Sequence, residues 1–583
     1  MDSNKITRAI SLLAFYGIAF VVFTYPLVLE FDDAFISDGS DGCQFVWNIY
    51  NFTDNLEHSK PLFYTDKLYY PIGSSLILHV YAPVFSIVGL LVGNPVLALN
   101  ITVALSFVFS GIGAYLLCNH YVRNRLLSAL AGFVFAYCPY KLLHIYGHYD
   151  LMLTATIPFF ILFFVKSLKG IDGGRRLRLV DRRSLILALV MLAVTYFSSY
   201  YYTFFLIIFV LLYVFYFTLK IYAFRLFTRR NLIYGLGIIL VSTAIVAIFE
   251  RLGLDRDGIA RNGLGRSADV LAFFVPSASS RFLASGPVRH IRFEVIRANE
   301  AESTVYIGYA ILVFAAGYFF KRQYRGQSAE AKVLPFMTGC FMVLAMPLVL
   351  VADRIVCALP SALIHYIPFV NNFRVPYRYT IMIMLFLPIL AGLFIKRWIW
   401  DAIPRRLHLV LIAALVVILS LEYMQQPFPM VSRSEVPEVY EYLATQPDGV
   451  LLEIPFGLRD GFREIGDEQS IQIFYQTVHH KKILGGVLSR PRREIFEFFM
   501  TEPVVSDLIR MQEDETWDPE LPGPEGMSKF LKTFSPRYVL IHPEYRESRT
   551  GHFVEAMFSG HVSDTKDVDG FLLMTIELPG TGY

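Results

Sequence analysis

Apolar stretches that approach the length of a membrane span recur along this chain from Ile6 to Leu421. A helix needs about 20 mostly apolar residues to cross the hydrocarbon core of a bilayer. Eleven stretches are predicted to be transmembrane helices, over residues 6–29, 95–119, 126–139, 151–164, 185–197, 202–224, 232–249, 305–320, 333–351, 379–395 and 407–421. A further apolar segment, Leu76–Val92, is interrupted by Pro83 and Gly89, and we interpret it as a re-entrant or interfacial helix.

The composition fits this class of protein. Hydrophobic residues make up 55% of the 583 residues and charged residues only 17%, and the mean hydropathy is +0.49. Soluble globular proteins carry about 25% charged residues, and this composition also excludes disordered, collagen-like and coiled-coil chains. Five cysteines, an odd number in a long chain, give no disulfide framework.

Basic residues predict the orientation of the helices. Clusters of Lys and Arg follow the second, fourth, sixth, eighth and tenth predicted helices, and the largest runs from Lys166 to Arg183. Cytoplasmic loops are enriched in Lys and Arg, so the N-terminus is predicted to be cytoplasmic. The outer side then holds residues 30–94, 140–150, 250–304, 352–378 and everything after about Glu422. We expect a multi-pass protein of the plasma (inner) membrane.

The chain changes character after Tyr423. Charged residues become more frequent, and the apolar runs shorten to the length of strands, at Val450–Ile454, Lys482–Leu484, Tyr538–His542 and Phe571–Ile576. Helical patterns lie between these runs, which is typical of an α/β domain. We therefore predict an α-helical polytopic transmembrane domain over residues 1–424, with outer loops at 30–94 and 250–304. A soluble extracytoplasmic α/β domain, periplasmic or extracellular, is predicted over residues 425–583.

The first outer loop is rich in carboxylates. Five of them lie within twelve residues: Glu30, Asp32, Asp33, Asp38 and Asp41. Crowded carboxylates repel one another, which raises some pKa values and suits proton transfer or cation binding. A solvated acidic loop with a turn explains the same residues equally well. After the turn, Cys43–Asn55 has the pattern of an interfacial helix that lies along the bilayer.

Histidines and arginines in other outer segments are candidate ligands. His144 and His148 are four residues apart, so a helix would place both on one face, where Asp150 could join them around a cation. Anchoring of a helix end at the membrane surface is the alternative, and hydrogen bonding to a phosphate is a third. Arg374 and Arg378 precede a predicted span, where arginines meet an anion or a carboxylate, or snorkel to lipid headgroups.

The sequence holds no motif for nucleotide binding or for a serine hydrolase. It lacks a P-loop, a G-x-G-x-x-G turn that opens a helix, the protein-kinase set and G-x-S-x-G. ATP-driven transport is therefore not expected from this chain. The predicted spans also hold few charged residues, unlike those of most ion-coupled transporters.

Five stretches stand out by their order and their placement in the loops: Ser40–Asn48, Tyr69–Gly73, Phe135–His144, Glu302–Gly308 and Phe373–Tyr379. Together they resemble the GT-C-type polytopic membrane glycosyltransferases and, more narrowly, the bacterial YfhO-like membrane proteins. The resemblance runs along most of the chain. It implies a GT-C-like fold with a large first outer loop and a C-terminal extracytoplasmic domain.

The resemblance also implies a glycosyltransferase that works on the outer face. Its donor would be a polyprenyl-phosphate-linked sugar, and its acceptor a hydroxyl group of a glycan, a lipid or a protein. A carboxylate of the first loop would act as general base, with inversion at the anomeric carbon. Asp41 aligns best with the family's acid, and Asp38 is the second choice. The candidate substrate-binding residues are Arg374, Arg378, His144, His148 and Glu302, the last to orient the sugar or an arginine.

The chain departs from the family pattern in its acids. Many members have an adjacent acid pair in the first loop, but here the pair Asp32-Asp33 lies close to the first helix, so the identity of the base stays open. Some relatives use a metal, and this sequence lacks a convincing ligand set, so a divalent cation is only a candidate cofactor. The expected partners are the donor lipid, the acceptor and membrane lipids, without nucleic acid.

Two other functions are alternatives. A non-catalytic protein of the same fold would bind or scaffold the assembly of cell-surface glycopolymers. A transporter would move a lipid-linked saccharide across the membrane. The sparse charge inside the predicted spans makes transport the weaker of the two.

Overall fold

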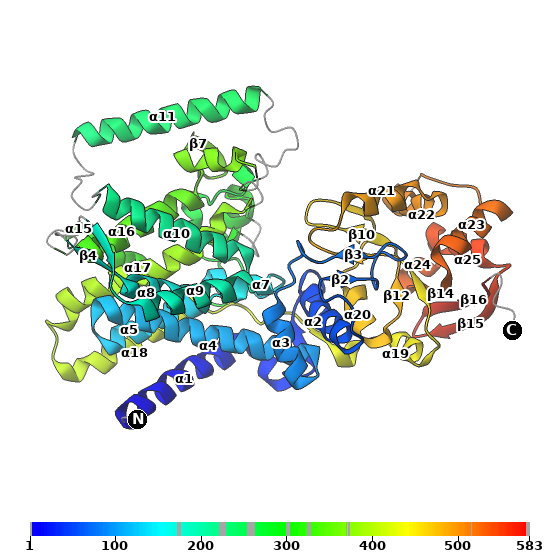
Figure 1. Cartoon of the computed structure of the whole chain (residues 1–583), viewed down its shortest axis with the longest axis horizontal. Helices are drawn as coiled ribbons and strands as arrows, with labels where there is room; N and C mark the ends of the chain where they lie inside the picture. Colours follow the sequence, from blue (N-terminus) through cyan, green and yellow to red (C-terminus); the bar gives the residue numbers. More distant parts are fainter. Residues whose placement is uncertain are drawn as a thin grey trace. The chain divides into compact units, whose positions relative to one another are not determined.

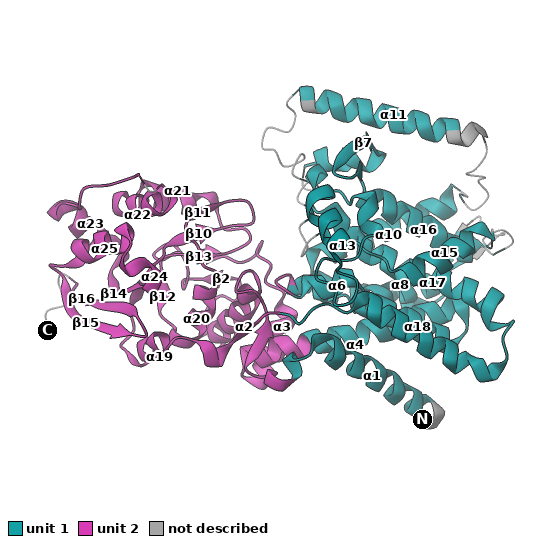
Figure 2. Cartoon of the chain, turned by 180° about the vertical axis from the view of Figure 1, so that it is seen from behind, with its two compact units in different colours: residues 1–28, 103–145, 149–428 teal, residues 29–102, 146–148, 429–583 magenta. Residues whose placement is uncertain are grey.

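The computed structural model describes residues 3–171, 176–219, 221, 229–252, 263–298, 303–321, 323, 327, 329–368, 370, 373–514 and 516–578. Figure 1 shows its helices and strands. The chain divides into two compact units, each built from segments that lie far apart in the sequence (Figure 2). Unit 1 holds residues 1–28, 103–145 and 149–428, and unit 2 holds residues 29–102, 146–148 and 429–583.

Unit 1 is made mainly of apolar helices (teal in Figure 2). Six helices of the described chain are long and apolar enough to cross a membrane: Lys5–Thr24, Pro95–Val122, Arg125–His144, Tyr200–Thr218, Pro376–Trp400 and Arg405–Tyr423. They coincide with six of the eleven predicted spans. A helix satisfies its own backbone hydrogen bonds, as hydrocarbon requires. The prediction of an α-helical membrane protein is confirmed.

The predicted count of eleven spans is not confirmed, because the remaining segments form shorter helices. These are α8 (Thr156–Ser167), α9 (Arg182–Tyr196), α15 (Tyr309–Phe320) and α16 (Ala329–Ala345), of 12, 15, 12 and 17 residues. A full span needs about 20 residues. In α11 (Arg229–Arg251) the apolar part, Ile233–Phe249, is likewise shorter than a full span.

Two apolar segments contain more than helix. The span predicted over 333–351 is wrong at its end, because Leu348–Val351 is strand β6, antiparallel to β7 (Arg354–Ala358). A short run of Val and Leu does not by itself distinguish a strand from a helix. The segment Leu76–Val92 is helical only over α3 (Pro83–Val92), which begins at its proline. Proline is favoured in the first turn of a helix.

Helix α17 (Thr380–Ile395) is a buried element of unit 1. It has 16 residues, of which only Leu393 and Phe394 are not buried, and it packs against α5 (Arg125–Tyr137), α15 and α16. A helix that is apolar around its whole circumference is suited to such a place. By contrast, only 22% of the apolar window of α1 (Ser3–Thr24) is buried, as in a helix that faces lipid.

The C-terminal part of unit 2, residues 429–583, contains a five-stranded sheet (magenta in Figure 2). The strand order is β12-β9-β14-β16-β15. β12 (Lys482–Ile483), β9 (Val450–Ile454) and β14 (Pro536–Ile541) are parallel, and β16 (Phe571–Ile576) and β15 (Val562–Val568) add antiparallel strands at one edge. Parallel pairing requires crossovers, which explains the helices between these strands. The four strands predicted from apolar runs are confirmed.

The first loop belongs to the same unit as this sheet. Strand β1 (Ala34–Ile36) pairs antiparallel with β8 (Met430–Ser432). Helix α2 (Gly42–Glu57) packs against both α3 and α20 (Ile471–His479), and 12 of its 16 residues are buried. Protein segments therefore cover α2 on two sides. That α2 lies along the bilayer stays a prediction.

Candidate catalytic site

Asp41 occupies the position directly before helix α2. The helix begins at Gly42, and the backbone N–H of Gln44 donates to the carbonyl oxygen of Asp41 at 3.2 Å. Aspartate is favoured at this position because its carboxylate often caps the helix. Here the Asp41 side chain makes no such capping bond. Its carboxylate is therefore available for other contacts, and the side chain is 37% exposed.

One oxygen of the Asp41 carboxylate is held and the other is open. Arg459 Nη2 donates to Oδ1 at 2.7 Å, and Gln44 Nε2 donates to the same oxygen at 3.1 Å. Within the described part of the chain, no group donates a hydrogen bond to Oδ2. Hydrogen bonds from a charged donor are short and strong. The two donors therefore give the open oxygen a defined direction.

Arg459 is itself held on its other side. Its Nε donates to Glu468 Oε2 at 2.8 Å, and its Nη2 also donates to Ser470 Oγ at 2.7 Å. Ser470 Oγ in turn donates to Glu468 Oε2 at 3.1 Å. A planar guanidinium with several donors suits this kind of bridging. Arg459 thus links two carboxylates, Asp41 of the first loop and Glu468 of the C-terminal part.

Glu468 is the buried acid of this cluster. Its side chain is 2% exposed, and its Oε1 has no hydrogen-bond partner among the residues described. Burial raises the pKa of Glu468 to about 7, because the loss of hydration outweighs the opposing charge of Arg459. This carboxyl group therefore gains or loses its proton near neutral pH.

A glycine allows the segment Tyr146–His148 to approach Asp41. A Cβ atom placed on Gly147 would lie 3.1 Å from the Cβ atom of Asp41 and 3.3 Å from the amide nitrogen of Gly42. His148, one of the predicted substrate-binding residues, follows Gly147 directly and is partly buried. The structure thus brings the chain at His148 beside Asp41 within unit 2.

Two other first-loop acids have local roles. Asp38 is exposed and accepts hydrogen bonds from the hydroxyl and, at 3.1 Å, from the backbone N–H of Ser40, as in an Asx turn. Asp33 accepts hydrogen bonds from the hydroxyls of Ser432 and Ser434. Partial burial would raise the pKa of Asp33, but these hydrogen bonds outweigh it and lower the pKa. Asp33 therefore anchors the start of the C-terminal part.

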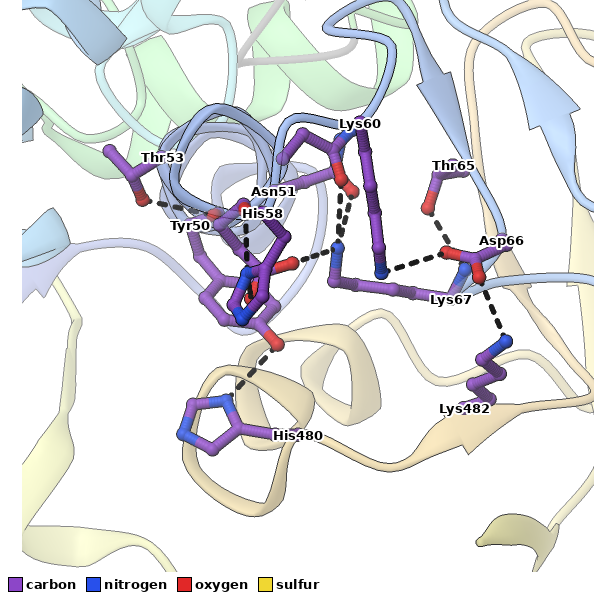
Figure 3. A network of polar contacts seen from close by, with 12 residues as sticks. Tyr50, Asn51, Thr53, His58, Lys60, Thr65, Asp66, Lys67, His480 and Lys482 are labelled. Carbon is purple, nitrogen blue, oxygen red and sulfur yellow. Dashed lines mark hydrogen bonds and ion pairs between the residues drawn. The ribbon is translucent and has the colours of Figure 1, made fainter. Parts of the chain in front are cut away.

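A polar network joins helix α2 to a later segment of the first loop, around Lys67 (Figure 3). Lys67 is 5% exposed, and its Nζ forms an ion pair with Asp54 at 2.7 Å. The same ammonium donates to the side chains of Asn51 and Asn55 at 3.3 and 3.1 Å. Burial lowers the pKa of Lys67, and Asp54 opposes that effect. One buried cation thus holds three side chains of α2.

Residues of the C-terminal part fix the same helix from another side. The indole N–H of Trp47, a fully buried side chain, donates to Gln476 Oε1 at 2.5 Å. His480 Nδ1 lies 3.0 Å from the hydroxyl of Tyr50 (Figure 3). These partners are 429 and 430 positions apart in the sequence. The helix that begins beside Asp41 is therefore held by non-local contacts.

The remaining candidate residues in the described chain belong to unit 1. Helix α6 (Pro139–His144) ends at His144, and a turn follows, so His144 and His148 do not share a helical face as predicted. His144 is buried, and its Nδ1 lies 2.6 Å from the carbonyl oxygen of Tyr140. Glu302 lies outside the described residues.

The two candidate arginines are buried in unit 1. Arg374 is 8% exposed and Arg378 is 7% exposed. Arg378 lies on the short helix η7 (Pro376–Tyr379), with its guanidinium carbon 4.5 Å from the centre of the Tyr201 ring, a cation–π distance. Such burial differs from the predicted alternative, in which arginines snorkel to lipid headgroups.

Carboxylate and histidine side chains give limited support for a metal. Across the described ranges, no group of three or more His, Cys, Asp or Glu side chains is arranged to hold a metal ion. The open Oδ2 of Asp41 offers one oxygen ligand. Magnesium is often bound through one or two carboxylates, with water and substrate phosphate oxygens as the other ligands. A divalent cation at Asp41 would fit only in that form.

The sequence matches the family model described as "Domain of unknown function (DUF6311)" over residues 14–419. The chain belongs to this family. The DUF6311 region covers the first loop and most of the helical unit, and it ends before the α/β part of unit 2. No curated protein matches the DUF6311 chain in sequence.

Solved structures of an arabinofuranosyltransferase and an oligosaccharyltransferase resemble the DUF6311 chain. A variant of the arabinofuranosyltransferase AftD from Mycobacteria has a TM-score of 0.50 and 13% identity, over 97% of this chain and 41% of that chain. The apo oligosaccharyltransferase of Archaeoglobus fulgidus has a TM-score of 0.47 and 12% identity, over 94% of this chain and 71% of that chain. The likeness to AftD supports the predicted GT-C-like fold, and the DUF6311 chain spans less than half of AftD.

A third solved structure carries ligands. It is the Archaeoglobus fulgidus oligosaccharyltransferase AglB in complex with an inhibitory peptide and a dolichol-phosphate. Its TM-score to the DUF6311 chain is 0.45 with 12% identity, over 100% of this chain and 75% of that chain.

The sequence did not point to Arg459, Glu468 or Gln44 as members of the site. Gln44 lies three residues after Asp41, so the spacing of one helical turn was the available signal. Arg459 lies 418 positions from Asp41, in a segment predicted to be a separate domain. No local sequence pattern links two positions that lie so far apart along the chain.

Proposed function

We propose that this chain is a glycosyltransferase that moves a sugar from a polyprenyl-phosphate-linked donor to an acceptor hydroxyl group, with Asp41 as general base. The observation that carries the proposal is the Asp41 carboxylate, whose Oδ1 is held by two donors while its Oδ2 is open. The fold shared with the arabinofuranosyltransferase AftD supports the same class of reaction, by analogy of fold.

In the proposed reaction, Oδ2 of Asp41 takes the proton of the acceptor hydroxyl as its oxygen attacks the anomeric carbon. The bond from that carbon to the lipid phosphate breaks, the phosphate leaves with the electron pair, and the configuration inverts. A general base contributes typically about 10²–10⁴-fold in rate. The departing phosphate needs positive charge or hydrogen-bond donors.

The other residues take the roles that the sequence suggests. Arg374, Arg378, His144 and His148 are the proposed donors to the departing phosphate. Glu302 is proposed to orient the sugar or an arginine, and Asp38 is the second choice for the base. A divalent cation stays an optional cofactor, and the acceptor is a glycan, a lipid or a protein.

The orientation in the membrane is part of the proposal. The basic loops favour a cytoplasmic N-terminus and an outer-face location for the first loop and for residues 425–583. The donor and acceptor would then meet at the outer face of the plasma (inner) membrane. A closer relationship to the YfhO-like proteins within the GT-C type is proposed on the same five sequence stretches.

Substitution of Asp41 tests the proposal directly. Asp41→Asn keeps the shape of the side chain but removes its ability to accept a proton, so transfer is expected to fall at least about a hundredfold. Purified full-length protein is incubated with a panel of radiolabelled polyprenyl-phosphate sugars, and loss of label from the lipid is measured. Glu57→Gln, an exposed acid on the same helix, is the matched control and is expected to keep full activity.

The outcomes separate the two acids and the reaction itself. Transfer that survives in Asp41→Asn but is lost in Asp38→Asn would assign the base to Asp38. An absence of both turnover and binding with every donor of the panel would contradict a glycosyltransferase.

A non-catalytic binding or scaffold protein is the second candidate. It is favoured by the ion pair of Asp41 with Arg459 at 2.7 Å, since a purely structural contact would use the same pair. Under that function, Asp41→Asn lowers the melting temperature of the protein, and no donor is turned over by the wild type.

A further inference from the structure

The contact of Arg459 with Asp41 joins segments of unit 2 that are 418 positions apart. Arg459 is the last residue of strand β10 (Gly457–Arg459), and Glu468 and Ser470 shortly precede helix α20. Asp41 precedes α2, and α2 packs against α20. The guanidinium of Arg459 is therefore fixed between the starts of two helices that contact each other.

Two carboxylates share this one guanidinium. Arg459 donates through Nη2 to Asp41 and through Nε to Glu468. With both acids ionised, the three groups carry a net charge of minus one. With Glu468 protonated, the net charge is zero and the guanidinium has a single anionic partner. Charges in a partly buried site interact more strongly than in water, so this difference matters to Asp41.

Other charged and titratable groups face Glu468. Glu464, on strand β11 (Glu464–Gly466), raises the pKa of Glu468, and Arg459 and Ser470 lower it. From the first loop, Cys43 and Tyr69 lie within the electrostatic reach of Glu468, and the charge of Glu468 raises the pKa of each beyond the larger effect of burial. Asp38 acts on Cys43 in the same sense. Several acids therefore surround Glu468, and Arg459 is the cation that offsets their charge.

We infer that Arg459 is the positioning residue for Asp41, and that Glu468 controls through Arg459 how tightly the first-loop acid is held. The inference rests on the proposed role of Asp41. Below neutral pH, Glu468 is neutral and the charge of Arg459 is balanced by Asp41 alone, so Oδ2 keeps a fixed direction. Above neutral pH, the ionised Glu468 takes a larger share of the guanidinium and Asp41 is held less tightly.

Hydrogen–deuterium exchange tests this positioning without any need for turnover. Backbone exchange in peptides covering residues 37–48 of the full-length protein is compared at pH 6 and pH 8, after correction for the intrinsic pH dependence. The wild type is expected to exchange several-fold faster at pH 8. Glu468→Gln should remove the difference, because glutamine accepts from Arg459 but does not ionise. Arg459→Gln should exchange fast at both pH values.

Kinetics distinguish positioning from a merely structural role. Arg459→Gln is expected to lower kcat for sugar transfer at least tenfold and to change KM less than twofold, because binding of the donor does not depend on Asp41. Arg459→Lys should restore part of kcat. Glu468→Gln should remove an inflection near pH 7 from the pH profile of kcat. The matched control is Arg463→Gln, at an exposed arginine in the turn between strands β10 and β11.

Each outcome decides a different point. Unchanged exchange and unchanged kcat in Arg459→Gln would overturn the positioning role of Arg459. A pH difference that persists in Glu468→Gln would overturn the control by Glu468. If no donor is turned over while the exchange differences occur as described, the proposed function fails and the positioning of Asp41 by Arg459 stands.

Discussion

The carboxylates of the first loop differ in the donors around them more than in their spacing. Asp33 receives serine hydroxyls, Asp38 closes a turn, and Asp41 receives a guanidinium. Their clustering in the sequence predicted a set of acids with perturbed titration. Burial instead raises the pKa of Glu468, in the C-terminal part, to about 7. Sequence proximity groups these acids, but their tertiary donors distinguish them.

Glu468 is expected to lower the stability of the protein as the pH rises. Its pKa is raised from 4.5 to about 7 in the folded protein. Between these values the folded state keeps a proton that the unfolded state has already released. The free energy of unfolding therefore falls with increasing pH across this window and levels off above it, by on the order of 3 kcal/mol.

The melting temperature of the full-length protein in detergent, followed from pH 4 to pH 8, measures this effect. The difference between the wild type and Glu468→Gln isolates Glu468 from other groups. The wild type should lose stability relative to the variant as the pH increases towards 7, while Glu57→Gln should follow the wild type. A constant difference between the wild type and Glu468→Gln at every pH would refute the assignment.

Helix α2 shows what the pattern of one element can predict. A helix over Cys43–Asn55 was expected, and α2 extends over Gly42–Glu57. The same pattern indicated an interfacial helix, because Trp47 lies on a different face from Phe45 and Ile49. In the structure Trp47 is buried against Gln476 of α20. Periodicity reports the faces of a helix, but a polar partner from elsewhere in the chain decides whether a face is exposed.

Trp47→Phe is expected to weaken the packing of α2 on α20. The phenyl ring fills much of the indole volume but leaves the buried Oε1 of Gln476 without its donor at 2.5 Å. An unsatisfied buried acceptor costs about 1–3 kcal/mol. Thermal unfolding of the full-length protein, followed by circular dichroism, measures the loss.

The matched control for this substitution is Trp517→Phe. Trp517 is exposed, and its hydrogen bond to Asp507 is 3.3 Å long and accessible to water. Surface substitutions of this kind change stability by less than about 0.5 kcal/mol. Equal destabilisation by the two substitutions would show that the hydrogen bond from Trp47 to Gln476 contributes nothing specific.

In the molecule as a whole, unit 2 brings the first loop together with residues 429–583. The change in composition at Tyr423 and the strand-length runs predicted an α/β fold after the helices. They did not predict that β1 pairs with β8, or that Lys482 forms an ion pair with Asp66 at 2.8 Å. Both contacts are non-local, and strands of three residues carry too little pattern to specify a partner.

Because these contacts hold unit 2 together, the C-terminal part is expected to stay bound after the chain is cut. A protease site inserted between Gln426 and Pro427, two exposed residues before β8, would separate it covalently from helix α18 (His408–Tyr423). The pairing of β1 with β8 and the packing of α2 on α20 remain intact after such a cut. Both involve segments of the first loop.

Affinity purification through a tag at the C-terminus, in mild detergent after cleavage, measures whether the membrane fragment is retained. The wild-type fragments should co-purify. Trp47→Ala should release a substantial share of the membrane fragment, since it removes a large buried side chain and a buried donor, losses of about 3–5 kcal/mol in packing alone. Trp517→Ala, at an exposed position, should release no more than the wild type. Complete release of the wild-type fragment on cleavage would mean that the first loop and the C-terminal part do not form a stable unit.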